Sequence, residues 1–182
     1  INELSNEQKG GGVLIILHIV GLVGLLGPFK DWFVLLTPFN LMVSLIILVL
    51  FQKPRNRRFW FLLVFIMAMG FAIEVIGVNT GYPFGIYEYG PPFGIKWLGT
   101  PFLIGVNWFI MAFCGAMITR RVSKNIYLNS LLSGLLITLF DVILEPVAIA
   151  YNFWTWEADT VPIQNYLTWT ISIALFSFLI FK

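Results

Sequence analysis

Six long apolar segments constrain the fold of this chain more than any other feature of its sequence. Each is close to the roughly 20 residues that an α-helix needs to cross a bilayer. They cover about residues 11–27, 32–51, 59–78, 98–118, 126–150 and 163–181. Inside lipid, only helices and closed barrels pair every backbone polar group. We therefore expect an all-α fold, an integral membrane bundle of about six transmembrane helices that forms one domain over residues 1–182.

Composition supports a membrane protein and excludes several other classes. Of the 182 residues, 59% are hydrophobic and 11% are charged, whereas charged residues make up about 25% of an ordinary soluble domain. The net charge of +2 is too small to suggest a nucleic-acid partner. A single cysteine rules out a disulfide framework.

The basic residues predict an orientation in the membrane. They are concentrated in the second and fourth connections, at residues 53–58 and 120–124. Because cytoplasmic loops carry the excess of Lys and Arg, both connections and both termini are expected in the cytoplasm of a multi-pass protein of the cell (inner) membrane. The third connection, residues 79–97, and the fifth, residues 151–162, then lie outside.

Two carboxyl groups lie inside the fifth apolar segment. Asp141, Glu145, Ala148 and Asn152 follow one another at steps of four, three and four, so a helix would place them on one stripe. Lys and Arg are absent from residues 131–181. An ionisable side chain inside a membrane span indicates a functional site.

Glu74, near the outer end of the third segment, brings a third acid to the same side of the bilayer. Burial disfavours a charged carboxylate that has no cation beside it, so we expect one of these acids to hold its proton at neutral pH. Such an acid can protonate an electron-rich alkene, and a second carboxylate can deprotonate a water that captures the carbocation. Aromatic faces would stabilise that cation; the candidates are Trp108, Trp154, Trp156 and Trp169.

Other chemistries fit these residues less well. A metal-bound diphosphate site needs further acids and basic residues facing the phosphates, and Lys96 is the one cation of the third and fifth connections. His18 is the sole histidine, too few for a di-metal oxidase. We read His18 as a packed or hydrogen-bonded residue and expect neither a metal nor an organic cofactor.

Four motifs resemble those of the CruF-type carotenoid 1,2-hydratase family. They are EVIGVNTGYPFGIYEYG at residues 74–90, GVNWF at 105–109, FDVILEPVAIAYNFWTWE at 140–157 and VPIQNYLTW at 161–169. The resemblance implies addition of water to the terminal C1–C2 double bond of an acyclic (ψ) carotenoid end group. Lycopene, γ-carotene and longer acyclic carotenoids are the implied substrates, and a 1-hydroxy carotenoid is the implied product.

The resemblance also implies that these motifs supply the active site. The expected catalytic acids are Glu74, Asp141 and Glu145, with Asp141 or Glu145 favoured as proton donor. The expected residues that position substrate or water are Asn79, Tyr82, Tyr87, Glu88, Asn107, Trp108, Asn152, Trp154, Trp156, Asn165 and Trp169. If these residues had no role in an active site, they would be explained as interfacial aromatic belts, solvated charges and hydrogen bonds between helices.

Two alternatives remain open from the sequence. A membrane lycopene cyclase would begin with the same protonation, but an internal double bond would trap the cation, so that product mass would not change. A six-span substrate-binding subunit of a vitamin transporter would have a similar size and hydropathy, and it would return its ligand unaltered.

Overall fold

The structure is a computed structural model that describes residues 5–158 and 160–182. Its elements are α1 (Asn6–Leu26), α2 (Lys30–Leu35), α3 (Thr37–Phe51), α4 (Arg57–Thr80), β1 (Tyr87–Tyr89), the 3-10 helix η1 (Pro91–Phe93), β2 (Lys96–Trp97), β3 (Thr100–Pro101), α5 (Leu103–Thr119), α6 (Ile126–Ala150), β4 (Trp154–Trp156) and α7 (Ile163–Phe181).

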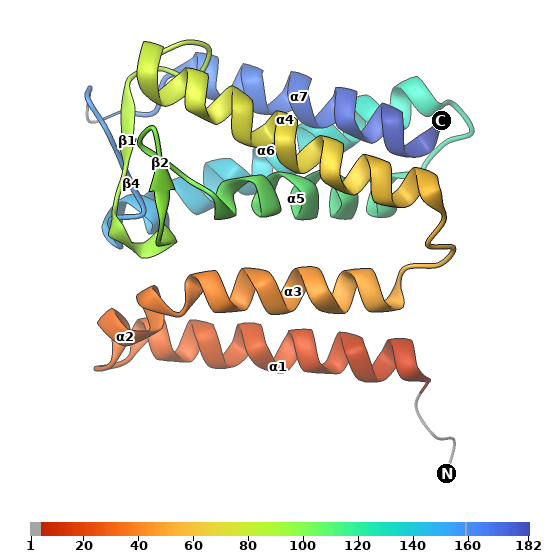
Figure 1. Ribbon diagram of the computed structural model, residues 1–182, viewed down its shortest axis with the longest axis horizontal. Helices are drawn as coiled ribbons and strands as arrows, with labels where there is room; N and C mark the ends of the chain where they lie inside the picture. The colour runs from red at the N-terminus through yellow and green to blue at the C-terminus, as the bar shows by residue number, and fades with distance from the viewer. Residues whose placement is uncertain (1–4, 159) are drawn as a thin grey trace.

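The long helices run antiparallel along one axis (Figure 1). Helices α4 to α7 form a bundle, and α1 and α3 form a hairpin beside it (Figure 1). Helix α3 packs against both α1 and α5 and joins the two parts. The short strands and α2 lie at one end, the cap end, whereas the start of α1, the end of α7 and the two basic connections lie at the other (Figure 1).

Local sequence signals fix where the helices begin and end. The side chain of Asn56 accepts a hydrogen bond from the backbone of Phe59 at the start of α4, and Asn125 does the same for Tyr127 at the start of α6. Such side chains satisfy backbone donors that the first turn of a helix leaves unpaired. Helix α4 ends at Gly81, whose φ of 70° is a left-handed conformation suited to glycine.

The apolar segments correspond to helices. Helix α1 starts earlier than expected, at Asn6, and α4 is two residues longer at each end. Two segments differ further. The second segment is divided into α2 and α3, because Pro38 lacks a backbone N–H and fits the first turn of a new helix. The fourth segment begins as β-structure at Thr100 and Pro101, so α5 starts later than expected. Helices α6 and α7 span the same residues as the fifth and sixth segments.

The surface of these helices is that of a membrane protein. Helices α1, α4, α6 and α7 are long and apolar enough to cross a bilayer, and α3 and α5 are shorter apolar helices. Ile15, Ile16 and Val23 of α1 are 62–65% exposed. Apolar surface on this scale must be shielded from water, and the lipid of a membrane shields it. The prediction of an all-α membrane bundle is confirmed, and the chain is a multi-pass membrane protein.

Helices α6 and α7 make the closest helix pair of the bundle. Ser133 and Ser177 share a buried hydrogen bond of 2.6 Å across this pair, and Thr138 and Thr170 share one of 2.8 Å. A Cβ atom built on Gly134 would lie 2.3 Å from the backbone oxygen of Thr170. A glycine is therefore needed at this crossing, as is common where membrane helices approach each other closely.

Replacing Gly134 with Ala is expected to destabilise the protein. The added methyl group meets a backbone carbonyl that cannot rotate away, so the helices must separate, at a cost of about 1–3 kcal/mol. The melting temperature in detergent should fall by about 5 °C. Gly12→Ala is the matched control, since a Cβ atom at Gly12 meets nothing within 4 Å. An equal melting temperature for Gly134→Ala and Gly12→Ala would contradict the close crossing.

A two-stranded antiparallel ribbon covers the cap end of the bundle. Strand β1 pairs with β4 so that Tyr87 lies opposite Trp156 and Tyr89 lies opposite Trp154. Because side chains alternate along a strand, these four aromatic residues share the face toward the helices. The middle pair, Glu88 and Thr155, occupies the opposite face. The ribbon thus places four polar aromatic groups directly over the helix ends.

Candidate functional site

Three carboxyl groups from two helices line one cavity beneath the ribbon. Glu74 of α4 is 2% exposed, and Asp141 and Glu145 of α6 are 5% and 3% exposed. The cavity volume is about 40 Å³, enough for a few water molecules, since each needs roughly 10–15 Å³. The other lining residues are Phe84, Tyr87, Tyr89, Ile104, Asn107, Met111, Ile137, Phe140, Leu144, Trp154, Trp156, Asn165 and Trp169.

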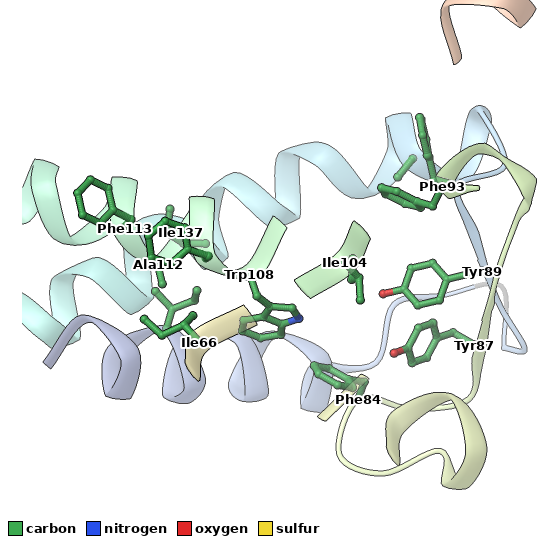
Figure 2. Close-up of a cluster of buried hydrophobic side chains, with 14 of the residues drawn as sticks. Ile66, Phe84, Tyr87, Tyr89, Phe93, Ile104, Trp108, Ala112, Phe113 and Ile137 are labelled. Atoms are coloured by element: carbon green, nitrogen blue, oxygen red, sulfur yellow. The ribbon is translucent and has the colours of Figure 1, made fainter. Parts of the chain in front are cut away.

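Glu74 accepts three hydrogen bonds and uses both of its carboxylate oxygens. The hydroxyl groups of Tyr87 and Tyr89 donate to Oε2, the second over 2.7 Å. The indole Nε1 of Trp108 donates to Oε1 over 2.9 Å. Figure 2 shows these hydroxyl groups and the indole nitrogen pointing toward a common space. A carboxylate that accepts two or three such bonds is stabilised in its charged form.

The glycines on both sides of Glu74 make room for this arrangement. A Cβ atom at Gly70 would lie 2.4 Å from the Trp108 ring, and one at Gly77 would lie 2.6 Å from the Phe84 ring. A larger residue at either position would therefore collide with a ring that packs next to the acid. Aromatic rings from the cap and from α5 fill the space.

Glu145 and Asp141 are less completely hydrogen-bonded than Glu74. The indole groups of Trp154 and Trp156 both donate to Oε2 of Glu145, over 2.8 and 3.1 Å. Asn165 donates to Oδ2 of Asp141 over 3.1 Å. Among the described residues, Oε1 of Glu145 and Oδ1 of Asp141 receive no side-chain hydrogen bond, and both residues line the cavity. These two oxygens are available for a proton, a water or a substrate.

The two cap phenols remain hydrogen-bond donors. Burial raises the pKa of Tyr87 and of Tyr89 well above the usual value of a phenol, and the charge of Glu74 raises both further. Both hydroxyl groups are therefore protonated at neutral pH, and each donates to the carboxylate of Glu74. The tyrosines hold the acid in place and do not act as bases.

The four candidate tryptophans contact their surroundings in two different ways. Three of the four, Trp108, Trp154 and Trp156, donate an indole N–H to a carboxylate, an arrangement that the sequence did not predict. Trp169 instead stacks on Trp108, with ring centroids 4.1 Å apart and planes within 7°. Trp154 and Trp156 thus position Glu145 and also line the cavity, whereas Trp108 positions Glu74 from outside the cavity lining.

Asn152 does not lie on the acid stripe. Helix α6 ends at Ala150, and Asn152 takes a φ of 57° in the turn that follows. Its side chain is exposed and does not line the cavity. The stripe expected from the spacing therefore ends at Ala148, because the chain leaves the helix to enter strand β4.

Three further candidates also lie outside the cavity. Asn79 is exposed, and its amide donates to the backbone oxygens of Val75 and Leu98 at the end of α4. Tyr82 is 72% exposed. Glu88 is exposed on the outer face of the ribbon, because the residue between two inward-facing tyrosines of a strand must point outward. These corrections leave Asn107 and Asn165 as the cavity amides.

His18 lies on an exposed face of α1, where its ring contacts the backbone oxygen of Leu14 over 2.8 Å. It does not line the acid cavity. Over residues 5–158 and 160–182, no group of three or more His, Cys, Asp or Glu side chains is arranged to hold a metal ion.

Sequence reasoning missed Tyr89 and the apolar wall of the cavity. Tyr89 hydrogen-bonds Glu74 as directly as Tyr87 does. The alternation Tyr87, Glu88, Tyr89 is the signal that could have found it, since an extended segment places the two tyrosines on one face. The apolar wall, by contrast, carries no local signal. It consists of Phe84, Ile104, Met111, Ile137, Phe140 and Leu144.

Fold and site define a multi-pass helical membrane protein with three carboxyl groups in a small aromatic cavity. The family of carotenoid biosynthesis proteins matches residues 31–181, and the chain belongs to this family. The resemblance seen in the sequence motifs is thereby confirmed at the level of the family.

One curated relative gives a more specific comparison. The chain is 30% identical to the bisanhydrobacterioruberin hydratase of Haloarcula japonica over 91% of its own length. It spans 64% of the length of that relative. No solved structure matches the chain.

Proposed function

We propose that this protein is a carotenoid hydratase that adds water to the terminal C1–C2 double bond of an acyclic carotenoid end group. The observation that carries the proposal is the cavity in which Glu74, Asp141 and Glu145 converge. Acid-catalysed hydration needs a proton donor, a place for water and a base, and the cavity offers groups for all three. The hydratase relative and the biosynthetic family support this function over a vitamin-binding subunit.

The first step is proton transfer to the alkene. Asp141 and Glu145 lie one helical turn apart on α6, and each has an oxygen that receives no side-chain hydrogen bond among the described residues. Two carboxyl groups this close share a proton readily, since both cannot ionise cheaply. The protonated member of the pair gives its proton to C2, and the π electrons form the new C–H bond. A tertiary carbocation is left at C1.

Glu74 has a different role in this scheme. Its three hydrogen-bond donors engage both carboxylate oxygens and stabilise the charged form of this acid. A fixed negative charge beside the cavity favours a carbocation, because donors and charges that are already oriented need no rearrangement as charge develops. We assign Glu74 to electrostatic stabilisation and the α6 pair to proton transfer.

Water capture completes the reaction. A water oxygen bonds to C1, and its extra proton passes to the carboxylate that began the cycle, so the acid is regenerated. The side chains of Asn107 and Asn165 line the cavity and offer donors and acceptors for that water. The net change is one water added per double bond. The mechanism requires no oxidant, reductant or organic cofactor.

The location in the cell follows from the charge pattern. We place both termini and the basic connections in the cytoplasm, with the cap end and the acid cavity toward the outer face of the inner membrane. The carotenoid would reach the cavity from the lipid phase.

Expression in cells that accumulate lycopene tests the proposed function. We expect a product heavier than lycopene by one water, with an almost unchanged visible spectrum, because the hydrated bond lies outside the conjugated system. A product of unchanged mass with a ring at its end would assign the protein to the cyclases. Lycopene recovered unaltered, in cells shown to contain the folded protein, would contradict an enzyme acting on this substrate.

A further inference from the structure

An apolar groove of about 500 Å³ lies between α1, α3 and α5. Leu14 belongs to the wall formed by α1, Ile47 to that of α3, and Met111 and Cys114 to that of α5. Two of its polar residues already have partners within the protein. The His18 ring contacts the backbone oxygen of Leu14, and the Ser44 hydroxyl donates to the Asn40 side chain. Glu7, the one charged residue of the lining, is exposed at the start of α1. The rest of the groove therefore suits a hydrocarbon better than a polar ligand.

The groove adjoins the acid cavity at Met111, a residue of α5 that lines both of them. Cavity and groove together extend along α5 from Ile104 to Met117, a distance of about 20 Å at 1.5 Å per residue. Methionine is a flexible side chain that can adjust its shape between two spaces.

The cavity and the groove differ in volume, so each suits a different part of a long substrate. The cavity, at about 40 Å³, accommodates water and the reacting tip of a chain. The groove is more than ten times larger, at about 500 Å³. A long linear substrate whose end reacts at the acids must leave the cavity along some apolar path. The groove is such a path, because it adjoins the cavity at Met111.

We propose that the groove between α1, α3 and α5 binds the polyene chain of the substrate while its terminal double bond lies at the acids. This inference rests on the proposed function and adds the position of the substrate. It also assigns a role to the α1–α3 hairpin, which supplies none of the residues that line the acid cavity. Membrane lipid supplies the competing occupant, an acyl chain.

Two matched pairs of variants test the groove. Ile47→Trp fills it from α3, and Ile46→Trp places the same side chain on the neighbouring residue, which is 51% exposed outside the groove. Leu14→Trp and Ile15→Trp form the equivalent pair on α1, where Ile15 is 62% exposed. Each purified variant is placed in nanodiscs and incubated with lycopene. Lycopene retained per protein is measured by visible absorption, and product by mass spectrometry.

Both groove variants are expected to retain about tenfold less lycopene than their partners, because the indole occupies the space of the polyene. They should still hydrate 2-methyl-2-heptene, a short alkene with the same trisubstituted double bond, as fast as the controls do. Should one groove variant fail to fold, as judged by gel filtration, the other pair decides. Retention equal within both pairs would overturn the groove, as would a wild-type protein that holds lipid but no lycopene.

The same experiment separates this inference from the proposed function. Lycopene retained by the wild type and lost from the groove variants, without product from any of them, would support the groove and refute the hydratase. Hydration by all variants with equal retention would support the hydratase and refute the groove.

Discussion

Glu145→Gln and Asp141→Asn are each expected to lower the hydration rate by at least about a hundredfold while the fold is preserved, because an amide cannot deliver a proton to the alkene. Each amide is close in size to the acid that it replaces. Its carbonyl oxygen can still accept the indole N–H groups of Trp154 and Trp156, or the amide of Asn165. The measurements are initial rates on lycopene and the melting temperature of each variant.

Glu88→Gln is the matched control for these two variants. It makes the same chemical change within the site motifs, but on the exposed outer face of the ribbon. Its rate should equal that of the wild type. Full activity of both Glu145→Gln and Asp141→Asn would remove the α6 pair from the mechanism, and a loss in Glu88→Gln would show that the ribbon face was assigned wrongly.

Glu74→Leu is expected to have the largest effect on stability. It leaves the hydroxyl groups of Tyr87 and Tyr89 and the indole N–H of Trp108 without their buried acceptor. An unsatisfied buried donor costs about 1–3 kcal/mol, so three of them should destabilise the protein by about 3 kcal/mol or more. The melting temperature should fall by about 10 °C, and activity should be lost.

A rescue experiment distinguishes this explanation from a simple packing defect. When both partners of a hydrogen bond become apolar, the net cost can be close to zero. Tyr87→Phe and Tyr89→Phe, added to Glu74→Leu, should therefore restore most of the lost melting temperature but none of the activity. A triple variant as unstable as Glu74→Leu alone would show that the two tyrosine hydroxyl groups do not account for the effect.

The sequence predicted the long helices well because hydrophobic runs determine them directly. Residues 126–150 and 163–181 are apolar segments, and the structure has helices over the same residues. The division of the second segment into two helices was harder to predict. The apolar character of this segment continues through the break between α2 and α3, and Pro38 was the one local indication of a new helix.

The site was predictable where an acid interrupts an apolar segment. Glu74, Asp141 and Glu145 could be named from sequence, since a carboxyl group in a membrane span needs a reason to be there, and the structure places all three at one cavity. Asn152 was wrongly placed on the helical stripe because the spacing argument assumed that the helix continued, whereas α6 ends two residues earlier.

The remaining contacts depend on strand pairing and on helix packing, which no spacing rule provides. The indole bonds to Glu145 arise because β4 turns back over the end of α6 and pairs with β1. The stacking of Trp108 on Trp169 joins α5 to α7. The groove requires three helices to be placed relative to one another, and it was not visible in any single segment.

The central claim is that a buried carboxyl group protonates the terminal alkene and that water captures the cation. The most direct measurement is hydration of lycopene by the purified protein in deuterated water enriched in oxygen-18, followed by mass spectrometry of the product. The account predicts one deuterium on C2 and oxygen-18 on C1 of each hydrated end. Oxygen from molecular oxygen, or a product that gains deuterium without oxygen, would contradict it.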